Sequence, residues 1–159
     1  MTIGVLSDTH SLNIPPAVVE RLKTVDLIIH AGDLCDLTTL KLLKKIGPTK
    51  AVQGNMDELA LKKELPLKET VVCGSLKIGV VHGHAGPARD ALINAMDSFK
   101  NDKMDVVIFG HSHHALNEKT GDTLYFNPGS PNDAVRAKFF SYGLISIEEG
   151  KIKAEIIKI

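Results

Sequence analysis

Metal-capable side chains follow the ends of five short apolar runs in this sequence of 159 residues. Carboxylate, carboxamide and imidazole groups occur at these positions, and divalent transition metals accept all three as ligands. The residues are Asp8, His10, Asp33, Asn55, His82, His111 and His113. A set of this size is enough for two ions about 3.5–4 Å apart with one bridging carboxylate, whereas a single zinc site takes about four ligands. The set therefore predicts a dinuclear metal centre.

The spacing within these groups also favours shared metal sites. Asp8 and His10 are two residues apart, as are His111 and His113. In an extended segment both members of such a pair project to the same side. The glycines that directly precede three of the ligands permit a sharp turn and a close approach of the backbone; they are Gly32, Gly54 and Gly110. Any one of these motifs alone is more typical of a turn or a cap, so the metal centre is inferred from their joint occurrence.

The elements that must position these residues begin with short runs rich in Val and Ile. These runs are typical of buried strands. We expect strands at 2–6, 25–29, 49–52, 71–72, 77–81 and 106–109. Each metal-capable group comes after one of these strands. Ligands bind outside the carboxyl ends of the strands in open α/β sheets, so the groups should converge on one crevice.

Helical patterns lie between several of the expected strands. One covers 17–22, another covers 37–46 behind a candidate N-cap at Asp36, and a third covers about 87–100. Alternation of strands and helices predicts an α/β fold with parallel strand pairs.

The last third of the sequence has a different pattern, in which turn signals rather than helices separate the apolar runs. We expect antiparallel hairpins formed by strands at 115–119, 123–126, 139–147 and 151–159. In the last of these, alternation places Ile152, Ala154, Ile156 and Lys158 on one side. This pattern predicts an edge strand with one buried face.

Composition limits the class of protein. The chain carries 19 Lys and Arg against 19 Asp and Glu, and no run of five or six like charges. This balance argues against a broad nucleic-acid face and against a membrane surface. The length predicts a single domain over residues 1–159. Cys35 and Cys73 are isolated, so we expect no disulfide framework and a reducing, cytoplasmic location. The start of the sequence does not resemble a signal peptide, and no apolar run is long enough to span a membrane.

The order of the motifs resembles that of the calcineurin-like metallophosphoesterases, and the match covers nearly the whole chain. The matching motifs are Asp8-Thr9-His10, Gly32-Asp33, Gly54-Asn55, His82 and Gly110-His111-Ser112-His113. The compact length, the motif His82-Gly83-His84 and the segment Asn127-Pro128-Gly129-Ser130-Pro131 resemble the small prokaryotic phosphodiesterase branch, which is related to the eukaryotic retromer subunit.

The resemblance implies a four-layer α/β/β/α sandwich with the dinuclear site at the strand ends. It also divides the ligands between the two ions. One ion is bound by Asp8, His10 and His113. The other ion is bound by Asn55, His82 and His111, and Asp33 bridges the two. By resemblance the metals are expected to be Mn²⁺, with Ni²⁺, Zn²⁺ or Fe²⁺ as alternatives.

The implied activity is metal-dependent hydrolysis of a small phosphoester, most simply a phosphodiester, by in-line attack of a metal-bridging hydroxide. A phosphomonoesterase and a catalytically weak metal-binding scaffold for protein interaction are the alternatives. A hydrolase of the metallo-β-lactamase type is less favoured, because its H-x-H-x-D-H pattern is only half matched at His111-Ser112-His113-His114. The sequence leaves open whether the protein forms a homo-oligomer.

One position departs from the family pattern. Many members have a His after the motif Gly-Asn, and that His can assist the leaving group, but this sequence has Met56. His84 is the best local substitute as a catalytic acid. The nearest cations by motif are Arg89 and Arg136, and both are of a type usually found at the surface. His30 precedes the Gly32-Asp33 motif and is expected to orient a ligand rather than bind metal.

Overall fold

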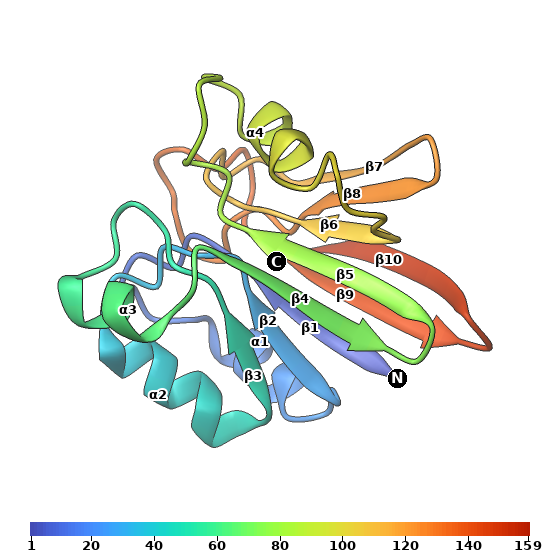
Figure 1. The fold of residues 1–159 in the computed structure, drawn as a ribbon. Helices are drawn as coiled ribbons and strands as arrows, with labels where there is room; N and C mark the ends of the chain where they lie inside the picture. The colour runs from blue at the N-terminus through green and yellow to red at the C-terminus, as the bar shows by residue number, and fades with distance from the viewer.

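Two mixed five-stranded sheets pack face to face in the computed structural model, which describes residues 1–159 (Figure 1). The first sheet consists, in order, of β10 (Lys151–Lys158), β9 (Ser141–Glu148), β1 (Thr2–Leu6), β2 (Leu27–His30) and β3 (Thr49–Ala51). The second consists of β4 (Lys68–Cys73), β5 (Leu76–Val81), β6 (Val106–Ile108), β8 (Thr123–Asn127) and β7 (Leu116–Thr120). Apolar side chains from both sheets, including Val5, Ile29, Val80 and Phe126, form the core between them.

Helices cover the outer faces of this sandwich. Three of them pack through leucines against the outer face of the first sheet: α1 (Pro16–Leu22), α2 (Leu37–Ile46) and α3 (Leu59–Glu64). The fourth, α4 (Ala91–Ser98), packs against the second sheet on the opposite side of the molecule (Figure 1). The layers are therefore α/β/β/α, as the resemblance implied. None of these helices combines the length and the apolar character that a membrane span requires.

The strand pairing places the ends of the central strands together. β1 runs parallel to β2, and β2 runs parallel to β3. In the other sheet β5, β6 and β8 are mutually parallel. The remaining pairs are antiparallel, including the predicted hairpins β7–β8 and β9–β10. The alternating residues of β10, such as Ile152 and Ile156, pack against the core between the sheets, so the prediction of a one-sided edge strand is confirmed.

Helix boundaries show where the sequence pattern succeeded and where it failed. α2 covers the predicted range, and Asp36 caps it by accepting a hydrogen bond from the backbone N–H of Thr39 at 2.8 Å. The expected helix at 87–100 was too long, because Asp90 accepts from the N–H groups of Leu92 and Ile93 and starts α4 at Ala91. α3 was not predicted, because it has only six residues and buries only Leu61.

Candidate metal centre

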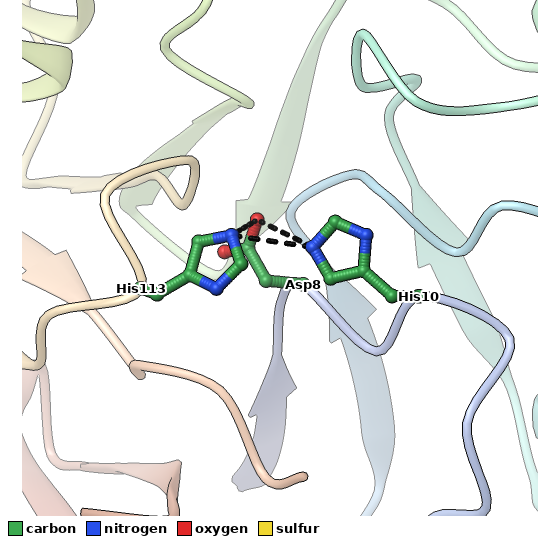
Figure 2. Close-up of side chains that lie close together, drawn as sticks. All are labelled: Asp8, His10 and His113. Atoms are coloured by element: carbon green, nitrogen blue, oxygen red, sulfur yellow. Dashed lines mark hydrogen bonds and ion pairs between the residues drawn. The ribbon is translucent and has the colours of Figure 1, made fainter. Parts of the chain in front are cut away.

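The loops that follow β1, β2, β5 and β6 bring their acidic and imidazole side chains together at one end of the sandwich. Figure 2 shows the first group, in which Asp8, His10 and His113 point toward a common centre. Nε2 of His10 lies 3.2 Å from Nε2 of His113. Oδ1 of Asp8 lies 3.3 Å from Nε2 of His113 and 4.0 Å from Nε2 of His10. This group offers one carboxylate and two imidazole ligands to one ion.

A second group shares Asp8 and adds Asp33 and His82, all three buried. Nε2 of His82 lies 3.3 Å from Oδ2 of Asp33 and 3.9 Å from Oδ1 of Asp8. The same Oδ2 of Asp33 lies 3.9 Å from Nε2 of His10, which belongs to the first group. Asp33 therefore faces both groups, as a bridging carboxylate must.

The remaining predicted residues lie at the rim of this cluster. The ring of His111 is 5.2 Å from that of His82, and the ring of His84 is 5.3 Å from that of His82. Both rings are half-buried. Asn55 is in the loop after β3 and is exposed, while the next residue, Met56, donates its backbone N–H to Oδ1 of Asp33 at 2.8 Å. The structure thus gathers five predicted ligands closely and holds His111 beside them, whereas Asn55 is exposed and is linked to the cluster through the backbone of Met56.

The backbone of the ligand loops is unusual. Five of the predicted ligands have left-handed φ values between 49° and 67°: Asp8, His10, Asp33, His111 and His113. Such a conformation costs an L-residue roughly 1–2 kcal/mol, and it persists only where the surrounding structure enforces it. The expectation that the paired ligands lie in extended segments was therefore wrong, although Asp8, His10 and His113 still point toward one another. Clustered strain of this kind is typical of functional sites.

Two buried polar atoms that face the centre of the cluster, Oδ1 of Asp8 and Nε2 of His82, have ion-pair contacts but no well-aligned hydrogen bond. The other oxygen of Asp8 accepts from Ser7 Oγ at 2.7 Å and from the N–H of His111 at 3.0 Å. Leaving a buried polar atom unsatisfied costs about 1–3 kcal/mol. Divalent cations bound in the cluster would satisfy both atoms, and the mixture of carboxylate and imidazole suits Mn²⁺, Fe²⁺, Ni²⁺ or Zn²⁺. The residues present fit a metal centre.

Electrostatics prepare these groups to bind a cation. Burial alone would raise the pKa of Asp33, but His82, together with the backbone N–H of Met56 and the ring of His10, lowers that pKa to about 2. Burial would lower the pKa of His82, yet Asp33 and Asp8 together raise it. Burial raises the pKa of Asp8, although His82 and His113 oppose the rise. In the absence of a cation, therefore, Asp33 and His82 form an ion pair, and a bound metal would displace the His82 proton.

Further polar groups orient the histidines. Nδ1 of His82 donates to the backbone carbonyl of Ala31 at 2.7 Å, which leaves Nε2 facing the site. Nδ1 of His113 lies 2.6 Å from Oδ2 of Asp133. A carboxylate or carbonyl on the far nitrogen fixes the tautomer and raises the basicity of a metal-binding histidine. Sequence reasoning missed Asp133, because only the folded chain shows that this loop carboxylate meets a histidine 20 positions earlier.

The segment 127–133 clamps the two ligand loops from outside. Ser130 Oγ donates to the carbonyl of Asp8 at 2.8 Å, and Asn132 Nδ2 donates to the carbonyl of Thr9 at 3.1 Å. Asn127 Nδ2 donates to the carbonyl of Gly110 at 3.0 Å. The segment Asn127-Pro128-Gly129-Ser130-Pro131 therefore lies near the site, where it fixes loop geometry.

Two buried side chains brace the site from beneath. Asp57 accepts from the N–H of Cys35 at 2.7 Å and of Gly54 at 2.6 Å, so it ties the loop after β2 to the loop after β3. Nε2 of His30 lies 3.1 Å from Oγ1 of Thr9, between the two ligands of the first motif. Burial lowers the pKa of His30 to about 3, so its ring is neutral. His30 thus holds the ligand loop rather than facing the cluster.

Glycine is required where these loops touch. A Cβ at Gly54 would collide with Oδ1 and the backbone N of Asp33, and one at Gly110 would collide with Ser7 Oγ. The expectation of a close backbone approach at these positions is confirmed.

Comparison with known sequences identifies proteins that this chain resembles. A family model described as the calcineurin-like phosphoesterase superfamily domain matches residues 1–150. A probable metallophosphoesterase of Methanocaldococcus jannaschii is 39% identical over 163 residues, which cover 100% of this chain and 82% of that protein. A phosphodiesterase of the same organism is 31% identical over 144 residues, which cover 81% of this chain and 83% of that protein.

Solved structures show the same fold. A novel archaeal phosphodiesterase superposes with a TM-score of 0.79 at 26% identity, covering 99% of this chain and 100% of that one. The wild-type vacuolar protein sorting 29 protein of Entamoeba histolytica, solved in complex with zinc, gives a TM-score of 0.75 at 26% identity, covering 99% of both chains. The similarity therefore extends over the whole sandwich, including the strand ends that carry the cluster.

Proposed function

This chain belongs to the calcineurin-like phosphoesterase superfamily, and we propose that it is a phosphodiesterase that works with two divalent metal ions. The observation that carries the proposal is that two groups of ligand atoms share Asp8 at one buried edge: one adds His10 and His113, and the other adds Asp33 and His82. Two such groups offer ligands for two ions. The named phosphodiesterase among its relatives supports the choice of reaction.

We assign the ligands as the family pattern divides them. One ion would be bound by Asp8, His10 and His113. The other would be bound by Asn55, His82 and His111. Asp33 would bridge them, which its contacts to both groups support. When bound, two such ions lower the pKa of a shared water toward neutrality and offset the charge on a phosphoryl group during in-line displacement. Mn²⁺ is the proposed metal, with Ni²⁺, Zn²⁺ and Fe²⁺ as alternatives.

The side chains of the chain have separate tasks in this reaction. Asp33 and Asp8 supply negative charge that holds the cations, while Asn55 can contribute an oxygen without adding charge, so the site keeps a net attraction for a phosphate anion. The clamp at residues 127–133 and the brace at Asp57 hold the ligand loops in their strained conformations. Such fixed geometry means that little reorganisation is needed when substrate arrives.

His84 is the proposed partner of the leaving group. Its ring is half-buried and lies 5.3 Å from the ring of His82 and 6.3 Å from that of His111. Burial, with the nearby His82 and His111, lowers the pKa of His84. The ring is therefore mostly neutral at pH 7, which suits a hydrogen bond to the leaving oxygen better than full proton transfer. This contribution should matter most for a poor leaving group.

The test is hydrolysis by protein that has been stripped of metal and refilled with Mn²⁺, Ni²⁺, Zn²⁺ or Mg²⁺. Bis(p-nitrophenyl) phosphate reports diesterase activity and p-nitrophenyl phosphate reports monoesterase activity. Diester turnover that requires added metal, and that Asp33→Asn abolishes, is the expected result. Turnover of the monoester alone would favour a phosphomonoesterase. Failure with both esters despite bound metal would favour the protein-interaction scaffold.

A further inference from the structure

An open cavity of about 360 Å³ adjoins the metal centre on the side of His10. Its size falls within the range of small-molecule sites. Besides His10 and Asp133 it is lined by Leu12, Met56, Val135 and Arg136. The three apolar side chains are well exposed, at 51% for Leu12, 55% for Met56 and 92% for Val135. Single exposed apolar residues are ordinary, but a group of them beside the candidate metal centre offers an apolar surface that a ligand could cover.

One carboxylate connects this cavity to the metal centre. Oδ2 of Asp133 lies 2.6 Å from Nδ1 of His113. Oδ1 of the same residue accepts hydrogen bonds from the backbone N–H groups of Val135 at 2.8 Å and Arg136 at 3.2 Å. The backbone at Leu12 is held as well, because Asn132 Nδ2 donates to the carbonyl of Leu12 at 3.2 Å. The walls of the cavity are thus built in fixed relation to the ligands.

Arg136 is the one cationic side chain among the lining residues. A guanidinium pairs with two phosphate oxygens at once and also stacks on aromatic faces. The thioether of Met56 likewise makes favourable contacts with aromatic rings. The lining therefore suits an anionic phosphate joined to a planar apolar group.

We propose that this cavity binds the ester substituent that stays on phosphorus, and that the substrates are phosphodiesters in which this substituent is an aromatic or nucleobase-sized group. The inference rests on the proposed function, because it places the phosphorus atom at the metal centre. Leu12, Met56 and Val135 cover the ring, while Arg136 pairs with a non-bridging oxygen. A monoester has no second substituent and leaves the apolar walls in water, so it gains nothing from the cavity.

The kinetic test uses three esters with the same leaving group. They are phenyl p-nitrophenyl phosphate, methyl p-nitrophenyl phosphate and p-nitrophenyl phosphate. Replacing Met56 by Ala should lower kcat/KM for the phenyl diester about 10-fold, while the methyl diester changes less than about 2-fold, because only the phenyl group buries area against that side chain. Val135→Ser should likewise lower kcat/KM for the phenyl diester more than for the methyl diester. Equal losses for the phenyl and methyl diesters would overturn the proposal.

A matched control is available on the far side of the fold. Val72 on β4 is 64% exposed and lies outside the cavity. Val72→Ala removes a similar exposed apolar group and should leave all three kcat/KM values unchanged. Because Met56 and Val135 are exposed as well, their variants should fold, and a thermal melt should show this. Arg136→Gln should raise KM for both diesters, since the phosphate oxygen is common to them.

A binding measurement separates this proposal from the proposed function. The chain has four methionines, so isotope labelling of their methyl groups gives four NMR signals, and Met56→Ala identifies one of them. Diphenyl phosphate should shift the Met56 signal in zinc-loaded or metal-free protein, and dimethyl phosphate should not. If the signal shifts but no ester is hydrolysed, the subsite stands and the proposed function fails. If esters are hydrolysed but diphenyl phosphate shifts no signal in either sample, the subsite fails and the function stands.

Discussion

Asp33→Asn is the substitution that probes the centre of the cluster, and its effect can be calculated for the protein without metal. The pKa of Asp33 is lowered from 3.8 to about 2, because His82, with smaller contributions from the N–H of Met56 and from His10, outweighs the effect of burial. One pKa unit corresponds to about 1.4 kcal/mol, so the ionised carboxylate stabilises the fold by roughly 2 kcal/mol. Asn keeps the acceptor for the N–H of Met56 but loses this charge. Metal-free Asp33→Asn protein should therefore be less stable by roughly 2 kcal/mol at pH 6.

The choice of pH 6 follows from the directions in which the pKa values of Asp33 and His82 are shifted. The contribution of Asp33 is complete above its unfolded pKa of 3.8 and is lost as the pH falls through about 2. The pKa of His82 is raised, so the contribution of His82 is complete below 6.5 and is lost as the pH rises through its folded pKa. Both groups are charged at pH 6. The difference between wild type and variant should shrink toward pH 2 and again at high pH.

Urea denaturation of the metal-free proteins measures this difference. Asp102→Asn is the matched control, because Asp102 pairs with Lys68 at 2.7 Å but both side chains are about 40% exposed. Such a surface pair contributes less than about 1 kcal/mol. Adding Mn²⁺ should stabilise the wild type and the control but not Asp33→Asn. Equal stability of wild type and Asp33→Asn at pH 6 would refute the ion pair inferred between Asp33 and His82.

Three further predictions concern the groups around the cluster. Asp133→Asn should fold normally but bind Mn²⁺ about 10–100-fold more weakly, measured by competition with a chelator, because the carboxylate no longer supports His113; unchanged affinity would show that the contact is incidental. Because His30 stays neutral down to about pH 3, the stability of the metal-free wild type should fall as the pH drops from 6.5, by about 1.4 kcal/mol per unit from this residue alone. For His30→Gln, urea denaturation at several pH values should show that the free energy of unfolding depends less steeply on pH than in the wild type. The same pH dependence in both proteins would count against the burial argument. His84→Ala should slow esters of poor leaving groups more than those of good ones, and equal slowing in steady-state assays would remove His84 from leaving-group chemistry.

Much of the architecture could be predicted because it depends on local chain pattern. The strand at 2–6 and the helix at 37–46 match the structure in range, since strong apolar periodicity and the Asp36 cap act within the segment itself. Convergence of the polar groups also followed from the sequence, because parallel strands end at the same edge. α3 escaped prediction, because a short helix that buries one leucine has no periodicity to detect.

The parts of the site that sequence reasoning missed depend on contacts between distant loops. Asp133 acts on His113 only because the turn at 127–133 returns over the first ligand loop. The sequence pattern around Asp57 is that of an ordinary loop. Its bracing role appears only in the fold, where β2 and β3 bring its two backbone partners, Cys35 and Gly54, together. The left-handed backbone at the ligands is likewise imposed by these contacts rather than by local preference.

The number of metal ions bound per chain tests the proposed function most directly. Metal-stripped protein would be dialysed against Mn²⁺ and its metal content measured, with Asp8→Asn in parallel because Asp8 belongs to both ligand groups. We expect two ions per chain in the wild type and loss of both in the variant. One ion per chain in the wild type, or an unchanged content in Asp8→Asn, would contradict a dinuclear centre built on these residues.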